Sequence, residues 1–299
     1  MSTTATLRRA WRAVGPVGLA RAGLAAARDR VHGRAARSAA EVAGLVRGAA
    51  ALEIGGPSAA FTRRGLLPVY GELSSADNVN FAGATLWERD LRDGGAYTPE
   101  GRRLGTQYLR EAGDLHGLPD ERYDVVLSSH TLEHLANPLR ALREWRRVCR
   151  PDGLLVLVLP HRDGTFDHRR PVTPLSHLRA DEERSMDESD DTHVPEVLRL
   201  HDLRRDWDVS SAEDFRIRVE DNLSTRTLHH HVFVAENALE AVADAGWSPI
   251  MAEARRPFDL LIVARNGPRA EPLTFNGSPF PSDRQIAQRP DQTPGRPPA

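Results

Sequence analysis

The chain has 299 residues, of which 40% are hydrophobic and 27% charged, and its formal net charge is −2. These values exclude a wholly disordered chain, a collagen-like chain and a coiled coil, and the charge gives no reason to expect nucleic acid as a partner. The single cysteine, Cys149, excludes an internal disulfide and any site built on several cysteines, so we expect a reducing, cytoplasmic location. No apolar run approaches the roughly 20 residues that span a bilayer, and arginines interrupt the first residues, so no secretory signal is expected.

Residues 1–50 form a basic, alanine-rich segment. They carry nine arginines against Asp29 and Glu41, which gives a local net charge of +7. Gly15 and Pro16 interrupt the segment, so the pattern predicts two or three amphipathic helical pieces. We expect them to form a helical cap on the domain that follows. The alternative is contact with an anionic membrane surface or an acidic partner.

Between residues 51 and 265, apolar strand-like runs alternate with helical patterns. This alternation is typical of an α/β fold with a doubly wound, mostly parallel sheet. Strands are expected at 51–54, 123–129, 154–159, 247–252 and 258–264, and helices from Pro138 onward and over 236–245. Asn137 before Pro138 is a good helix cap, and Gly246 is a good helix end. Residues 266–299 hold eight prolines with almost no apolar pattern, which predicts a disordered tail.

The residues that follow the predicted strands are the first candidates for a site, because ligands of open α/β sheets bind beyond the carboxyl ends of the strands. The first strand leads into Gly55-Gly56-Pro57-Ser58, where glycine allows close approach of a ligand and a following helix N-terminus would attract negative charge. Asp77, 24 residues after Glu53, is placed to accept hydrogen bonds from the two hydroxyls of a ribose. Glu72 is the competing candidate.

Five sequence blocks in register carry a family resemblance. They are residues 52–56, 113–120, 123–127, 132–134 and 150–154, and together they resemble a class I S-adenosylmethionine-dependent methyltransferase. The segments 55–58, 128–134 and 165–171 are similar to a bacterial subgroup of these enzymes. The family implies a Rossmann-like sheet of seven strands with a reversed last strand, with an insertion here over 161–231.

The resemblance also implies roles for particular residues. Glu53 and the glycine turn would hold the methionine end of the cofactor, Asp77 the ribose, and Asp114 with Leu115 the adenine. Pro57 departs from the family's third small residue and removes one N–H donor from the turn. The implied cofactor contacts are Glu53, Gly55, Gly56, Pro57, Ser58, Asp77, Asn78, Asp114, Leu115, Ser129 and His130.

The insertion is rich in histidine, with eight of the twelve histidines of the chain. An acceptor that bears a proton needs a base with a pKa near neutrality, and histidine fits that need. His134, His161 and His168 are the candidate bases. Two alternatives stay open: these side chains belong to the scaffold, or a divalent ion is bound by a set drawn from Asp167, His168, His193, His201, His229, His230 and His231.

The sequence therefore predicts an enzyme that moves a methyl group from S-adenosylmethionine to an oxygen or nitrogen of a small polar metabolite. Secondary-metabolite and saccharide biosynthesis are the expected settings. The alternatives are a metal-assisted or non-methylating enzyme on the same fold, and a non-catalytic protein that binds the cofactor.

Overall fold

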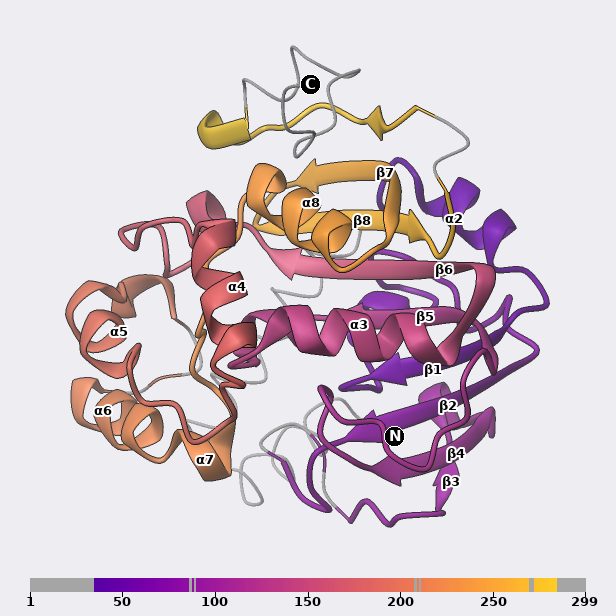
Figure 1. Cartoon of the computed structure of the whole chain (residues 1–299), viewed down its shortest axis with the longest axis horizontal. Coiled ribbons are helices and arrows are strands. Elements are labelled where there is room, and N and C mark those ends of the chain that lie inside the picture. The colour runs from indigo at the N-terminus through magenta and orange to yellow at the C-terminus, as the bar shows by residue number, and fades with distance from the viewer. Residues whose placement is uncertain are drawn as a thin grey trace, which may run out of the picture.

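The computed structural model describes residues 35–283 except 86, 87, 89, 207, 208, 210 and 269–271. Within this part, one nine-stranded sheet has the order β3-β4-β2-β1-β5-β6-β8-β7-β9 (Figure 1). The strands are β1 Ala50–Ile54, β2 Ser75–Asn80, β3 Ala96–Tyr97, β4 Gly105–Leu109, β5 Tyr123–Ser129, β6 Cys149–Pro160, β7 Ser248–Arg255, β8 Asp259–Arg265 and β9 Thr274–Phe275.

The seven strands from β4 to β7 in this order form the centre of the sheet. β4, β2, β1, β5 and β6 pair in parallel, whereas β8 runs antiparallel to both β6 and β7. The predicted Rossmann-like methyltransferase sheet with one reversed strand is therefore confirmed. The predicted count of seven differs from the nine observed, because β3 and β9 are edge strands of two residues each, too short for a periodic signal.

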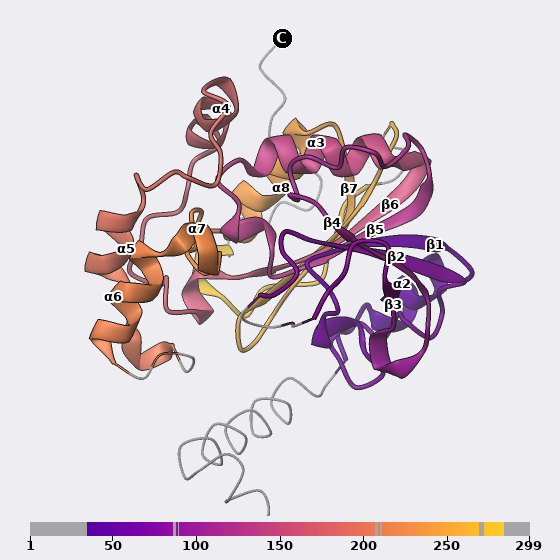
Figure 2. The same cartoon turned by 90° about the horizontal axis from the view of Figure 1, so that it is seen from below.

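The helices cover the two faces of the sheet unequally (Figures 1 and 2). α3 and α8 lie on one face, and α2 lies on the other. Asn137 caps α3 by accepting a hydrogen bond from Arg140 N, as the sequence predicts. The described helices are α2 Ala39–Leu45, α3 Pro138–Val148, α4 Leu175–Glu183, α5 Val194–Leu200, α6 Ala212–Glu220, α7 Asn222–Thr225 and α8 Ala235–Asp244.

The glycine turn after β1 does not lead into an α-helix. A single 3₁₀ turn, Ala59–Phe61, follows it, and the chain then runs as an irregular segment to β2. The prediction of a helix N-terminus beside the turn is therefore wrong. Gly65, Pro68 and Gly71 explain the difference, because a helix through these positions would lose hydrogen bonds and backbone stability.

The histidine-rich insertion forms a lobe beyond the carboxyl ends of the parallel strands, with α4 to α7 (Figure 1). Its own apolar cluster is small: Val197, Phe215, Val219 and Leu228. The rest of its interior is polar and charged, as described below. The lobe therefore lies where it can form one wall of a ligand site at the carboxyl ends of the strands.

Residues 272–283 contradict the predicted disordered tail. β9 pairs in parallel with β7, and the buried ring of Phe280 stacks on His161 at a centroid distance of 4.0 Å. Asp283 is also buried and accepts a hydrogen bond from Ala235 N at the start of α8. A high proline content was the basis of the prediction, but two phenylalanines in this stretch supply apolar area to bury. Residues 284–299 lie outside the described part.

The basic N-terminal segment is described only from residue 35. There α2 packs Val42 into the apolar layer beneath the sheet, which is the position expected of a cap. The predicted helical pieces in residues 1–34 lie outside the described residues. Among the residues that are described, no helix is both long and apolar enough to cross a membrane.

Candidate active site

A cavity of about 1430 Å³ opens at the carboxyl ends of β1, β2, β4 and β5. Its remaining walls come from the loop after the glycine turn, the start of β8 and the insertion. The residues that line it include Gly55, Pro57, Ser58, Asn80, Phe81, Arg110, Glu111, Ala112, Ser129, His130, Thr131, His134, Glu188, Arg226, Phe258 and Asp259. The position is the one that the fold favours for ligands.

The glycine turn forms one wall of this cavity. Gly55 has a φ of +81°, and a Cβ there would collide with Thr131 Oγ1, so only glycine fits. Pro57 and Ser58 also line the cavity, whereas Gly56 lies behind the wall. Gly56 N donates to Asn78 Oδ1 at 3.0 Å, which fixes the turn from beneath.

Glu53 does not line the cavity. Its buried carboxylate accepts hydrogen bonds from Tyr97 Oη, from Tyr70 Oη at 2.9 Å and from Ser58 N at 2.9 Å. Burial raises the pKa of Glu53 to about 7, although these hydrogen bonds act in the opposite direction. The structure therefore contradicts a direct cofactor contact at Glu53 and gives it the role of bracing the turn.

Asp77 is also in the wrong place for the predicted ribose contact. It lies inside β2, three residues before the strand ends, and its carboxylate accepts from Arg122 Nη2, Tyr123 Oη and Thr106 N at 2.8–2.9 Å. The competing candidate Glu72 precedes β2 and pairs with Arg47. Neither candidate lies at the end of β2, a strand that the sequence pattern did not predict.

Asn80 is the residue at the carboxyl end of β2 that the sequence analysis missed. It lines the cavity, and its Nδ2 donates to Gly56 O at 2.8 Å. Asn78, a predicted cofactor contact, is buried behind it and bonds Gly56 and Gln107 instead. The signal that could have found Asn80 is its place at the end of a strand, because ligands of this fold bind beyond the strand ends.

The two predicted adenine contacts do not line the cavity. Asp114 is exposed beside His116, and Leu115 is buried in the apolar core, so neither lines the cavity. Glu111 and Ala112 follow β4 directly and do line it. The pKa of Glu111 is raised because burial outweighs the ion pair with Arg226, at 2.8 Å, which lowers it.

Ser129, the last residue of β5, and His130, which follows it, line the cavity where the sequence predicted them. His130 has a φ of +52°, which is strained for a residue with a side chain and is common at functional sites. Its Nε2 lies 3.3 Å from Asp259 Oδ1, and its ring meets Phe258 edge-on. Their role as cofactor contacts stays a prediction.

Of the three candidate bases, the structure brings only His134 to the cavity. Burial lowers the pKa of His134 well below 6.5, and the nearby His229 acts in the same direction. His161 is fully buried under Phe280 and lies 3.0 Å from Asp283, so it is contradicted as a base. His168 is contradicted too, since it pairs with Asp202 at 3.0 Å away from the cavity wall.

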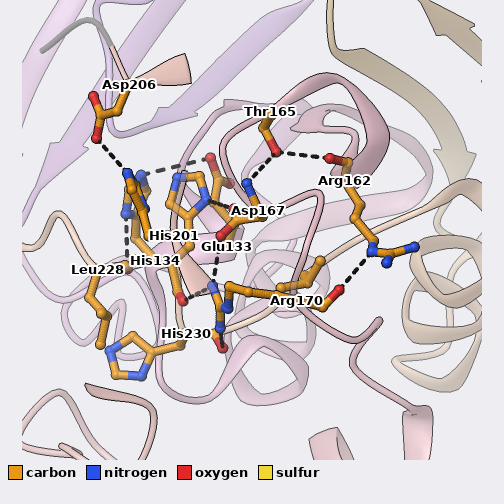
Figure 3. Close-up of polar contacts among 12 residues, drawn as sticks. Glu133, His134, Arg162, Thr165, Asp167, Arg170, His201, Asp206, Leu228 and His230 are labelled. Carbon is orange, nitrogen blue, oxygen red and sulfur yellow. Dashed lines mark hydrogen bonds and ion pairs between the residues drawn. The ribbon is translucent and has the colours of Figure 1, made fainter. Parts of the chain in front are cut away.

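A buried carboxylate lies directly behind His134. Glu133 Oε1 is 3.7 Å from His134 Nε2 and 3.6 Å from His130 Nδ1, and neither Glu133 oxygen has a hydrogen-bond partner. Burial raises the pKa of Glu133. His134 Nδ1 lies 3.1 Å from Leu228 O, and a carbonyl only accepts, so Nδ1 carries the proton and Nε2 keeps the lone pair. Figure 3 shows Glu133 and His134 beside the Asp167–Arg170 pair of the insertion.

The predicted metal-binding set does not converge on one point. His168 pairs with Asp202, His201 with Asp206 and His229 with Asp167. The other three members, His193, His230 and His231, gather elsewhere in the insertion. The reason is geometric, because successive residues in the extended stretch 229–231 point in different directions.

Comparisons with known proteins agree with this fold. A family model described as "Methyltransferase domain" matches residues 74–157. An uncharacterized methyltransferase of Mycolicibacterium vanbaalenii is 40% identical over 83 residues, which is 28% of this chain and 31% of that protein. A probable S-adenosylmethionine-dependent methyltransferase of Mycobacterium tuberculosis is 41% identical over 73 residues, covering 23% and 26% of the two chains.

A solved structure is similar as well. The 1,6-didemethyltoxoflavin-N1-methyltransferase of Burkholderia thailandensis, with 1,6-didemethyltoxoflavin and S-adenosylhomocysteine bound, is 16% identical, with a TM-score of 0.43 over 78% of each chain. The chain spans about a third of the length of the first curated relatives that it matches. The matched segment, the similarity to methyltransferases over part of the chain and the strand order together identify a class I S-adenosylmethionine-dependent methyltransferase domain in this chain.

Proposed function

We propose that the protein transfers the methyl group of S-adenosylmethionine to an oxygen or nitrogen of a small polar molecule held in the cavity. One observation carries this proposal: the cavity joins the glycine turn, the ends of β2 and β4, and a histidine-bearing strand end in a single space. Its volume of about 1430 Å³ leaves room for a second molecule beside the cofactor. Secondary metabolites and saccharides are the acceptor classes to screen first.

The residues present fit this cofactor. The backbone of Gly55 to Ser58 would approach its methionine end, since Gly55 has no side chain to block it. The Asn80 amide would face the ribose hydroxyls, and Glu111 with Ala112 the adenine. When bound, the cofactor supplies an electrophilic methyl group on a sulfonium ion. What remains for this chain is to orient the acceptor and to take its proton.

His134 is the residue that we assign to the proton. Because its pKa is held well below 6.5, the ring is neutral at physiological pH and can accept a proton. Glu133 behind it would stabilise the imidazolium that forms. His130, fixed by Asp259, would position the acceptor at the same strand end.

The test is production of S-adenosylhomocysteine from S-adenosylmethionine with a panel of hydroxyl- and amine-bearing small molecules, read by mass spectrometry. With an accepted substrate, His134→Ala should lower kcat by about 10²–10⁴ with little change in cofactor affinity. The matched control His168→Ala, which removes a histidine outside the cavity, should keep wild-type kcat. The wild-type rate should stay level from pH 6.5 upward and fall only in more acidic solution, where His134 gains a proton.

Other outcomes separate the alternatives. Cofactor binding without turnover on any acceptor would favour a non-catalytic cofactor-binding protein. Equal losses in His134→Ala and His168→Ala would contradict the assignment of His134. A rate that rises with pH through about 6.5 would point to a base with an ordinary histidine pKa.

A further inference from the structure

Three histidines of the insertion that have no role in the proposed methyl transfer lie close together. His177 comes from α4, His193 immediately precedes α5, and His231 lies just before α8. One ring nitrogen from each lies within 4.8 Å of the other two. We call these residues, with Asp181 of α4, the insertion cluster.

The tautomer of His193 directs a lone pair into the insertion cluster. Its Nδ1 lies 3.1 Å from Asp190 Oδ2, and a carboxylate only accepts, so Nδ1 carries the proton. Nε2 then holds a lone pair, and it faces His177 Nε2 at 3.1 Å. Two ring nitrogens directed at each other at this distance need a proton or a cation between them.

The tautomer of His231 leaves a second buried lone pair in this region. Its Nε2 lies 3.3 Å from Ala136 O, and a carbonyl only accepts, so Nδ1 is left with the lone pair. That Nδ1 is buried without a hydrogen-bond partner, and His231 is only 1% exposed. A buried lone pair without a donor is costly unless a cation binds it.

Asp181 adds an oxygen to these nitrogens. Its Oδ2 lies 3.2 Å from His177 Nε2 and 3.9 Å from His231 Nε2. The residue is 3% exposed, and Oδ2 also has no hydrogen-bond partner. The insertion cluster thus presents three imidazoles and one carboxylate, a donor set that suits a tetrahedral zinc-class ion.

Asp190 bonds one of these ligands, His193, from outside the insertion cluster, and His230 lies beside the same carboxylate. Asn222 Nδ2 lies 3.2 Å from His230 Nε2, while Asn222 Oδ1 accepts from Leu228 N at 2.9 Å. The amide nitrogen therefore donates to Nε2, which leaves the His230 proton on Nδ1, 3.5 Å from Asp190 Oδ2. Asp190 therefore accepts from the outer nitrogen of His193, as carboxylates behind metal-bound histidines commonly do, and His230 lies beside the same oxygen.

We propose that His177, His193, His231 and Asp181 bind one divalent ion of the zinc class, which ties α4, the start of α5 and the end of the insertion to one another. The chain between Asp181 and His193 contains Glu188, a cavity residue that accepts from Ala136 N and pairs with Arg226. Ion binding therefore orders a segment that forms part of the cavity wall.

Tag-free protein, stripped with a chelator and dialysed, is titrated with ZnSO₄ by calorimetry, with metal content read by mass spectrometry. We expect one ion per chain, a higher Tm on zinc addition, and a Co²⁺ form with the visible absorption of a tetrahedral site. His177→Ala and His193→Ala should weaken zinc affinity by at least tenfold and lose the rise in Tm. His116→Ala, at an exposed histidine outside the insertion, should bind zinc as the wild type does.

His177 is half-exposed, so His177→Ala removes a ligand with little risk to the fold. Wild-type protein that takes up no zinc at micromolar concentration would overturn the proposal. Unchanged zinc affinity in both His177→Ala and His193→Ala would overturn it as well. An ion lost only in His229→Ala would place the metal beside Glu133 and His134 instead, which also contradicts the insertion cluster. These readouts do not depend on methyl transfer.

Discussion

The sheet and the insertion bury different kinds of side chain. Between the sheet and α3, the buried residues are almost all apolar, with Leu139, Leu142 and Trp145 at their centre. Inside the insertion, by contrast, Arg170 is 1% exposed and pairs with Asp167 at 2.9 Å and Glu196 at 2.8 Å. Apolar burial is tolerant of exchange, but a buried charge depends on its partner. The insertion should therefore be the region that is most sensitive to loss of single charges.

The largest effect is expected at Asp167. Asp167→Ala leaves the Arg170 guanidinium short of its buried partner and removes the acceptor of His229 Nδ1, so the free energy of unfolding should fall by about 3–5 kcal/mol. Urea unfolding measures this loss. Arg216→Ala, which breaks the exposed pairs of Arg216 with Glu213 and Glu220, should leave the urea midpoint unchanged. Equal effects of the two variants would contradict the contrast between the regions.

A somewhat smaller effect is expected where the C-terminal segment docks. Phe280→Ala removes a buried ring that stacks on His161, and we expect a loss of about 3 kcal/mol, measured as a lower urea midpoint. Leu223→Ala, at an exposed position in α7, is the matched control and should leave the midpoint unchanged. A Phe280→Ala variant with wild-type stability would return this segment to the disorder that its proline content predicts.

The parts of the fold that the sequence predicts are those with strong periodicity. The apolar runs at 123–129 and 154–159 and the stripe of α3 appear where they were expected, because they are long and buried. The family resemblance supplied the reversal of one strand. β3 and β9 could not be predicted, since two-residue strands depend on pairing with a distant partner.

The candidate site was predicted less completely. Gly55, Pro57, Ser58, Ser129, His130 and His134 reach the cavity because each lies at or next to the end of a strand or within the adjoining turn. Asp77 and Asp114 do not reach the cavity because β2 and β4 were not predicted, so the ends of these strands, where a side chain meets the ligand edge, were not located. The partners of His161 and His168 come from residues 283 and 202, contacts that no local pattern reveals.

We propose that the cavity at the ends of β1, β2 and β4 binds the cofactor through Asn80 and not through Asp77. Calorimetric titration with S-adenosylhomocysteine tests it most directly, with wild-type protein, Asn80→Ala and Asp77→Asn in parallel. Wild-type protein should bind, Asn80→Ala should bind about tenfold more weakly through loss of about one hydrogen bond, and Asp77→Asn should stay within about twofold of wild type. A loss of affinity in Asp77→Asn with wild-type affinity in Asn80→Ala would contradict the assignment of Asn80. Wild-type protein that does not bind S-adenosylhomocysteine would contradict cofactor binding in this cavity.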